Sequence, residues 1–245
     1  MIKITKNILY LVIMIKRTLF QSLQNKFFKG KALILLGPRQ VGKTTLINEL
    51  LAAKKHLFLN GDDPSIREML DGVTTSKLKS IIGNHDVVFI DEAQRINDIG
   101  ITLKLITDQF KHVQLLVSGS SAFEINNKTQ EPLTGRKFEY LLYPISWEEL
   151  EGNIGFVESN QQLEERLIYG MYPDVINNRT DARDVLKQLT SSYLYKDVLL
   201  WERLHKSDKL VRLLQALAHQ IGSQVSFNEL AEICSMEGKT PFFVS

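Results

Sequence analysis

The sequence contains a single cysteine, Cys234, among 245 residues. One cysteine excludes an internal disulfide framework and a cysteine-based metal site, and it favours a reducing, cytoplasmic location. Cys234 follows apolar residues at helical spacing, which predicts a buried and unreactive thiol. The five histidines show no ligand spacing, so no histidine-based metal site is predicted either.

Long apolar runs are also lacking. The run from Ile8 to Ile15 has eight residues, whereas a helix needs about 20 to span a bilayer. Lys16-Arg17 follow it in place of a small-residue cleavage site, so we expect neither a membrane span nor a signal peptide. A buried strand or helix is the expectation for this run, unless Met14 is the true start of the protein.

Acidic residues are missing from the first 48 positions, which hold nine basic residues. The rest of the chain contains 21 basic and 28 acidic residues. A basic arm of this kind is typical of proteins that bind nucleic acid or an anionic membrane surface. An ordinary solvated face beside a phosphate site is the simpler interpretation, and we prefer it.

The composition, 44% hydrophobic and 24% charged, suits one α/β domain with a smaller appendage. Between residues 31 and 150, apolar runs alternate with helical patterns, as in a parallel sheet covered by helices. We therefore predict a basic arm or helix over 1–30, an α/β domain over 31–155 and a helical region over 156–245. The predicted strands are 32–36, 56–60, 86–91, 113–118 and 137–143, and the predicted helices between them are 43–54, 64–71, 75–83 and 98–110.

Capping residues mark several helix ends. Pro64 suits the first turn of its helix, behind Asp62 or Asp63 as cap. Ser146 to Glu149 form a capping box for a short helix that should end at Gly152. Later helices are predicted over 160–169, from Thr180 to about 204, from Ser207 to Gly222, and over 226–234.

The chemistry centres on one motif: Gly37, Pro38, Arg39, Gln40, Val41, Gly42, Lys43 and Thr44 fit G-x-x-x-x-G-K-[ST]. It lies between a predicted strand and a predicted helix, as a phosphate-binding loop requires, with Thr45 following. Backbone N–H groups would surround the β-phosphate, Lys43 would reach the β- and γ-phosphates, and Thr44 would ligate Mg²⁺. The sequence therefore predicts nucleoside triphosphate binding.

Two adjacent carboxylates, Asp91 and Glu92, end a run of four apolar residues. A buried parallel strand that delivers an acid at its carboxyl end reaches the usual ligand position of such a sheet. We expect Asp91 to hold Mg²⁺ through water and Glu92 to activate the attacking water as general base. This pair favours hydrolysis over transfer to a second substrate.

Small hydroxyl residues end the next buried run, at Ser118, Ser120 and Ser121. Ser118 or Ser120 would reach the attacking water or the γ-phosphate if this strand lies beside the P-loop strand. Serines also end strands for reasons of turn formation alone, and the sequence leaves both interpretations open.

Five blocks in one order give the chain a family resemblance: the P-loop, Phe89 to Gln94, Ser118 to Ser121, Leu133 to Arg136, and Tyr143 to Leu150. Together they resemble the AAA-type domain of a large group of predicted bacterial and archaeal ATPases with an uncharacterised C-terminal domain. The resemblance covers roughly residues 16–235. It implies a three-layer P-loop fold with strand order 5-1-4-3-2, Walker A and Walker B motifs, ATP as the nucleotide and a sensor position within Ser118 to Ser121.

The resemblance also implies that Arg136 is a nucleotide-responsive arginine. It would complete the γ-phosphate charge in its own subunit or in a neighbour's. The alternative is an ion pair with a surface acid such as Glu131 or Glu139. Arg39 and Arg95 are further candidates for the same role.

The C-terminal end departs from the family pattern. Residues 226–234 resemble the first helix of a helix-turn-helix, but five residues after Thr240 are too few for a recognition helix. We therefore expect a truncated C-terminal domain, no complete DNA-binding motif, and apolar faces over 180–222 that promote self-association.

The leading hypothesis is a Mg²⁺-dependent ATPase that couples hydrolysis to conformational change, as a homo-oligomer or with an unidentified protein partner. The alternatives are a nucleotide-occupancy switch with negligible turnover alone and a nucleic-acid-dependent ATPase that uses the basic arm. A metabolite kinase is the weakest reading because Glu92 suits water activation. The guanine-binding Asn-Lys-x-Asp signature is absent, since Thr129-Gln130 follow Asn127-Lys128.

Overall fold

The computed structural model describes residues 14–52, 54–119, 133–190 and 207–235. The chain divides into two compact units, Met1–Ala182 and Arg183–Ser245, and each is described by itself. Within the described ranges, no helix combines the length and apolarity that crossing a bilayer requires.

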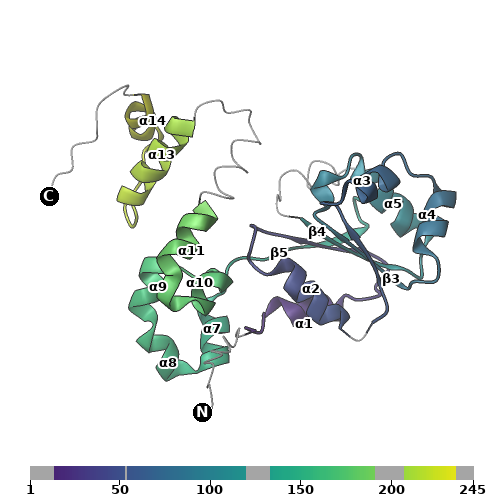
Figure 1. The fold of residues 1–245 in the computed structure, drawn as a ribbon, viewed down its shortest axis with the longest axis horizontal. Coiled ribbons are helices and arrows are strands. Elements are labelled where there is room, and N and C mark those ends of the chain that lie inside the picture. Colours follow the sequence, from purple (N-terminus) through teal and green to yellow (C-terminus); the bar gives the residue numbers. More distant parts are fainter. Residues whose placement is uncertain (1–13, 53, 120–132, 191–206, 236–245) are drawn as a thin grey trace, which may run out of the picture. The chain divides into compact units, whose positions relative to one another are not determined.

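A five-stranded parallel sheet forms the centre of the first unit (Figure 1), and every strand pair in it is parallel. Its strand order is β2-β3-β4-β1-β5, which is 5-1-4-3-2 when read from the other edge. The predicted order is therefore confirmed. The strands are β1 (Ala32–Leu36), β2 (Leu57–Asn60), β3 (Val87–Asp91), β4 (Gln114–Gly119) and β5 (Lys137–Leu141).

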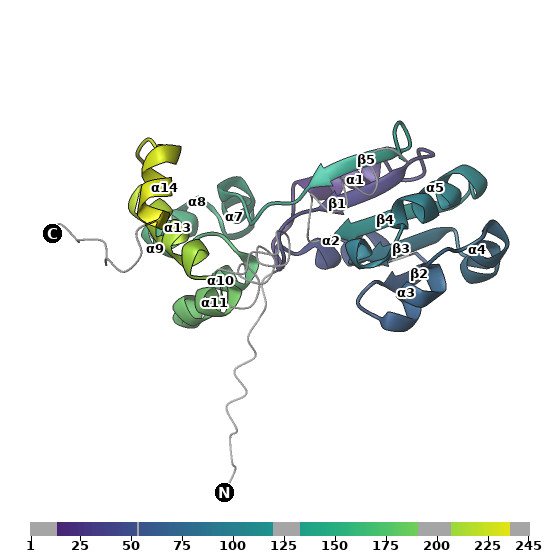
Figure 2. The same cartoon turned by 90° about the horizontal axis from the view of Figure 1, so that it is seen from above.

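Alternate residues of the buried strands point to opposite faces of the sheet, so each face needs its own helical cover. On one face, Ile34, Val88 and Val117 pack in a cluster with apolar residues of three helices. These are α3 (Pro64–Leu70), α4 (Thr75–Ile82) and α5 (Ile99–Gln109). The domain is thus built in three layers, and Figure 2 shows these helices on one side of the sheet.

The opposite face of the sheet packs against two helices, α1 (Leu19–Asn25) and α2 (Lys43–Leu51). Leu33, Leu35 and Phe89 share a buried cluster with Leu23 of α1 and Leu46 of α2. Because α2 is anchored through this apolar face, its first turn is held at the carboxyl end of β1, where the P-loop lies.

Local signals explain how several helices begin. Asp63 caps α3, its Oδ1 accepting from the N–H of Ser65 at 2.8 Å, and Pro64 stands in the first turn. Ser146 and Glu149 form both hydrogen bonds of the predicted capping box at α7 (Trp147–Ile154). The predicted end of this helix at Gly152 is wrong, because α7 continues to Ile154 and stops at Gly155, whose φ is +86°.

Short helices follow α7 in the first unit, and they differ from the prediction. The single helix expected over 160–169 is two helices, α8 (Phe156–Gln161) and α9 (Leu163–Tyr169), followed by α10 (Pro173–Asn177). Thr180 does not cap a long helix. It lies in the 3₁₀ turn η2 (Arg179–Asp181). Helix α11 (Ala182–Leu189) begins at the last residue of the first unit and otherwise belongs to the second.

In the second unit, α13 (Ser207–His219) and α14 (Phe227–Ser235) pack against each other. Ala216 of α13 and Leu230 of α14 are buried, whereas Ile221 and Phe227 are largely exposed. Cys234 lies in α14. The predictions for residues 1–13, Ser120, Ser121, Glu131, 191–206 and 236–245 lie outside the described residues.

Candidate functional site

The predicted P-loop connects β1 to α2 directly. Gly37 has a φ of +151° and lies against the backbone that follows β5. A Cβ on Gly37 would be 2.2 Å from the Leu142 carbonyl oxygen. Gln40 and Gly42 have φ values of +61° and +94°, and Gly42 is the N-cap of α2. Left-handed backbone at these positions turns successive N–H groups toward one side, which suits an anion.

The remaining P-loop residues divide between the core and the surface. Val41 is fully buried in the cluster beneath α2, and Lys43 is buried with its Nζ donating to the carbonyl oxygens of Gly37 and Pro38 at 2.9 and 2.7 Å. Arg39 and Thr44 are partly buried. The exposed members are Pro38, Gln40 and Thr45.

Asp91 receives hydrogen bonds from Thr44, its predicted partner at the metal ion, and from Ser118, for which no contact with Asp91 was predicted. The Thr44 hydroxyl donates to Asp91 Oδ2 at 2.9 Å, and the Ser118 hydroxyl donates to Asp91 Oδ1. Asp91 ends β3, and its neighbour Ile90 pairs with Val117 of β4, so Ser118 stands beside Asp91 across the sheet. Both side chains are buried. The structure therefore brings Lys43, Thr44, Asp91 and Ser118 together at the carboxyl ends of the strands.

Glu92 follows Asp91 with a left-handed backbone, φ +49° and ψ +41°. A residue other than glycine rarely adopts this conformation, and such strain is often found at functional sites. The Glu92 N–H donates to Asp91 Oδ1 at 3.1 Å, and Glu92 Oε2 accepts from Gln94 Nε2 at 2.6 Å. No sequence pattern predicted this contact between Glu92 and Gln94.

Gly61, which follows the neighbouring strand β2, lies in close contact with the Asp91–Glu92 backbone. Its N–H donates to the Asp91 carbonyl oxygen at 2.8 Å, and a Cβ at Gly61 would lie 2.4 Å from the Glu92 carbonyl oxygen. Only glycine permits so close an approach of two backbones. The turn that presents Glu92 is thus held by packing from outside the motif.

Arg136 lies at the amino ends of strands β1 and β5, whereas the P-loop follows the carboxyl end of β1. It precedes β5, and its carbonyl oxygen accepts from the N–H of Ala32, the first residue of β1. The five residues of β1 separate it from the P-loop by roughly 15 Å, at about 3.3 Å a residue. The structure therefore does not bring Arg136 to its own P-loop, and the idea that it acts in its own subunit does not fit this placement.

The alternative prediction for Arg136, a surface ion pair, is confirmed with Asp108 as the partner; of the two acids given as examples, Glu131 lies outside the described residues. Its Nε is 2.7 Å from Asp108 Oδ1, and both side chains are partly exposed. This contact holds the pKa of Asp108 below its ordinary value, chiefly through the hydrogen bond from Arg136. Arg95 lies near Glu92 in the chain and pairs with Asp62 at 2.7 Å.

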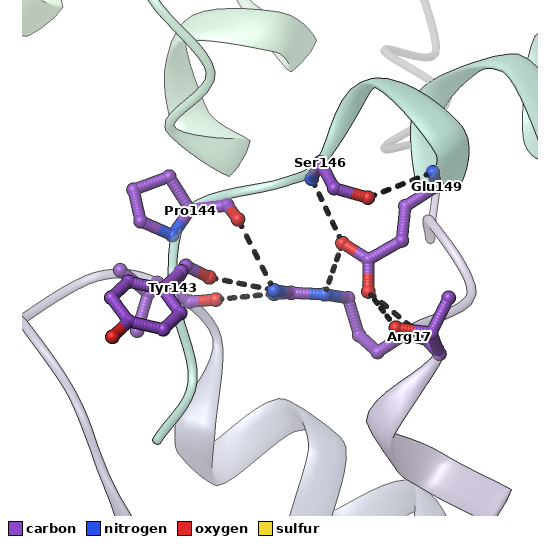
Figure 3. A network of polar contacts seen from close by, with 7 residues as sticks. Arg17, Tyr143, Pro144, Ser146 and Glu149 are labelled. Atoms are coloured by element: carbon purple, nitrogen blue, oxygen red, sulfur yellow. Dashed lines mark hydrogen bonds and ion pairs between the residues drawn. The ribbon is translucent and has the colours of Figure 1, made fainter.

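A polar network beside the P-loop also went unnoticed in the sequence (Figure 3). Arg17 Nε lies 3.1 Å from Glu149 Oε2, and both side chains are at least nine-tenths buried. Burial by itself raises the pKa of Glu149, but hydrogen bonds from Ser146, Thr18 and Arg17 outweigh it and lower the pKa. Arg17 therefore belongs to an internal ion pair and not to a solvated basic arm.

Comparison of the sequence with known families identifies the family of the P-loop domain. Residues 29–151, half of the chain, match the family described as AAA domain. The chain belongs to the AAA domain family. A second match, over residues 160–241, is to a family described as Domain of unknown function (DUF8612). The chain thus carries an AAA-type P-loop ATPase domain followed by a domain of unknown function.

Two curated relatives of this AAA protein are uncharacterised proteins of Mycobacterium bovis and Mycobacterium tuberculosis, each 27% identical over 115 residues. The match covers 46% of this chain and only a quarter of the length of either relative.

Among solved structures, a Walker-type ATPase of Pyrococcus abyssi has a TM-score of 0.54 at 16% identity, with 90% of this chain and 88% of that one covered. This likeness shows the shared fold. A signal transduction ATPase with numerous domains from Pyrococcus horikoshii has a TM-score of 0.45 at 11% identity, over 68% of this chain and 29% of that one.

The family implies a nucleotide and, as a rule, Mg²⁺, and the residues present fit both. A hydroxyl and a carboxylate oxygen, Thr44 Oγ1 and Asp91 Oδ2, lie 2.9 Å apart next to the P-loop. Mg²⁺ prefers such oxygen ligands and usually takes one or two from the protein, with water and phosphate oxygens completing its shell. When bound, the ion would neutralise charge on the transferring phosphate.

Proposed function

We propose that this AAA protein hydrolyses ATP with Mg²⁺. The observation that carries the proposal is the Asp91 carboxylate, held between Thr44 of the P-loop and Ser118 of the next strand, with Glu92 immediately following. In this proposal Thr44 and Asp91 hold the ion, directly or through water, and Lys43 neutralises the β- and γ-phosphates. Glu92 takes the proton of the attacking water as general base.

The Glu92 environment supports this role. Glu92 is partly exposed, and among the described residues its carboxylate accepts a hydrogen bond from a neutral amide, that of Gln94. The strained backbone of Glu92 would fix its direction relative to Asp91.

The test is steady-state hydrolysis of ATP by the full chain, with and without Mg²⁺, beside Lys43→Ala and Glu92→Gln. We expect Lys43→Ala to lose binding and turnover together. Glu92→Gln should bind ATP normally and lose turnover by about 10²- to 10⁴-fold, the usual contribution of a general base. Glu148→Gln, which replaces an exposed glutamate of α7, is the matched control and should behave as the wild type. Undiminished turnover in Glu92→Gln would contradict the proposed base.

We further propose that Arg136 serves a neighbouring subunit in a homo-oligomer. Arg136 lies at the amino ends of the strands, away from its own P-loop. This position supports action in trans, because a neighbouring subunit stacked on that end of the sheet would receive the guanidinium at its own P-loop. Asp108 would hold the arginine in place until a neighbour arrives.

Mixing two inactive variants tests this arrangement. Arg136→Ala retains an intact P-loop, and Lys43→Ala retains an intact Arg136, so a mixed oligomer contains some complete sites. Turnover that appears only on mixing supports action in trans. Full turnover by Arg136→Ala alone, at a concentration where the chain is monomeric by ultracentrifugation, would remove Arg136 from the site.

An occupancy switch with negligible turnover alone is the second candidate. The position of Arg136 away from its own P-loop favours this candidate, since a subunit whose arginine cannot reach its own P-loop would bind ATP without hydrolysing it. Slow turnover that rises with protein concentration would distinguish an assembly-dependent ATPase from such a switch.

A further inference from the structure

Arg17 connects three segments that are far apart in the sequence. Its Nη1 donates to the Val41 carbonyl oxygen of the P-loop at 2.7 Å, and its Nη2 donates to the Tyr143 carbonyl oxygen at 2.6 Å. Its Nε bonds Glu149 of α7 at 3.1 Å. Figure 3 shows the guanidinium of Arg17 between Tyr143 and Glu149. A planar guanidinium is suited to this task because its donors point in fixed, different directions.

Both carboxylate oxygens of Glu149 accept hydrogen bonds as well. Its Oε1 accepts from the N–H and the hydroxyl of Thr18 at 2.9 and 3.1 Å. Its Oε2 accepts from the N–H of Ser146 at 3.0 Å as well as from Arg17. One carboxylate thus closes the capping box of α7 and also binds Arg17 and Thr18. Figure 3 shows it between Ser146 and Arg17.

Stability alone does not account for a charged pair at this place. A buried ion pair is often no more stabilising than apolar side chains of the same volume, because both charges lose their water. What the pair provides is a defined direction for a backbone carbonyl in the P-loop, which an apolar contact would leave undefined.

The Val41 carbonyl matters because it shares a peptide group with the Gly42 N–H. In a trans peptide the C=O and the N–H point in opposite directions, so an anchor on Val41 oxygen also fixes the direction of the Gly42 N–H. Gly42 lies next to Arg17, since a Cβ on Gly42 would be 3.8 Å from Arg17 Nη1. Arg17 therefore binds the carbonyl side of the Val41–Gly42 peptide group, and the N–H on the other side of that group lies in the phosphate-binding loop.

We propose that Arg17 is a positioning residue that couples phosphate binding at the P-loop to the position of helix α7 through Glu149. The inference rests on the proposed nucleotide site. Phosphate that draws the Gly42 N–H reorients the Val41–Gly42 peptide, and Arg17 transmits the change to Glu149 and to the first turn of α7. The occupancy of the site then sets the position of α7 and of the segment after Tyr143.

The chain offers a reporter at the required position. Trp147 is the first residue of α7, and the sequence has only one other tryptophan, Trp201. In a Trp201→Phe background, the emission of Trp147 is measured during titration with ADP and Mg²⁺, and binding is measured in parallel by calorimetry. The variants are Arg17→Lys, which keeps the charge but loses the fork of donors, and Glu149→Gln, which keeps the shape but loses the charge. Arg179→Lys is the matched control, because it disrupts another ion pair of the same unit, with Glu165.

We expect ADP to change Trp147 emission in the background protein and in Arg179→Lys. Arg17→Lys and Glu149→Gln should bind ADP about tenfold more weakly, as expected for the loss of one hydrogen bond. They should show no emission change even at saturation. A purely structural role would alter affinity or melting temperature but leave the emission change at saturation intact, and that result overturns the inference. ADP binding without any emission change in the background protein also overturns it. No binding of ADP or ATP by the background protein would instead overturn the proposed function on which it rests.

Discussion

Ser118 donates a hydrogen bond from its buried hydroxyl to Asp91 Oδ1, across the pairing of β4 with β3. The second carboxylate oxygen of Asp91 accepts from Thr44 at 2.9 Å. The carboxylate is consequently held from two sides by residues that are 74 positions apart in the sequence. This arrangement ties the proposed Mg²⁺ site to the strand order, since only adjacent strands place a β4 side chain beside the end of β3.

Ser118→Ala should weaken the use of Mg²⁺ without preventing nucleotide binding. A hydrogen bond to a charged group contributes about 1.5–3 kcal/mol, so its loss would lower turnover or apparent Mg²⁺ affinity roughly tenfold or more. A Mg²⁺ titration of ATP hydrolysis measures the effect. Ser80→Ala, at an exposed position of α4, is the control. An unchanged Mg²⁺ dependence in Ser118→Ala would separate Ser118 from the metal site.

Gly61→Ala should disturb Glu92 from a neighbouring strand. The added Cβ would lie 2.4 Å from the Glu92 carbonyl oxygen, so the backbone must shift, at a cost of about 1–3 kcal/mol. We expect a lower melting temperature together with a loss of turnover. Gly152→Ala is the matched control, because Gly152 is exposed in α7 with no atom within 4 Å of an added Cβ. That variant should be as stable as the wild type or slightly more so. Full turnover in Gly61→Ala would show that the site tolerates movement of this turn.

Glu149→Gln should change how stability depends on pH. The folded state holds the pKa of Glu149 below its ordinary value of 4.5, so the unfolded chain binds the proton first as the pH falls. Glu149 therefore stabilises the fold above about pH 4.5 and loses that contribution as the pH drops through its lower, folded pKa. Urea unfolding at a series of pH values should show Glu149→Gln less stable than the wild type at pH 7, with a difference that shrinks in acid. A difference independent of pH would contradict this account, and Glu148→Gln should keep the slope of the wild type.

Local patterns predicted the parts of the site that are local in the sequence. The P-loop needs only the adjoining strand and helix, and the Asp91–Glu92 pair needs only the apolar run before it. The position of Ser118 beside Asp91 depends on which strands are neighbours, and the family resemblance supplied the order that the structure confirms. From the residues alone, a serine that ends a strand for turn formation was an equal alternative.

The misses have physical reasons. Arg17 and Glu149 are 132 residues apart, and no local pattern pairs an arginine with one glutamate among many. The partner of Arg136, Asp108, lies on α5, whose end meets the start of β5 only in the folded sheet. Gly152 did not end α7 because one exposed glycine costs a helix only about 1 kcal/mol, which the capping box and the buried Leu150 offset.

The most direct test of the central claim is the fate of ATP bound to Glu92→Gln. The variant is loaded with labelled ATP and Mg²⁺, freed of unbound nucleotide and incubated, and the nucleotide that remains bound is then separated into ATP and ADP. The account predicts that Glu92→Gln retains ATP, whereas the wild type under the same treatment yields ADP and phosphate. Conversion to ADP at equal rates in both proteins, or no retained nucleotide in either, would contradict it.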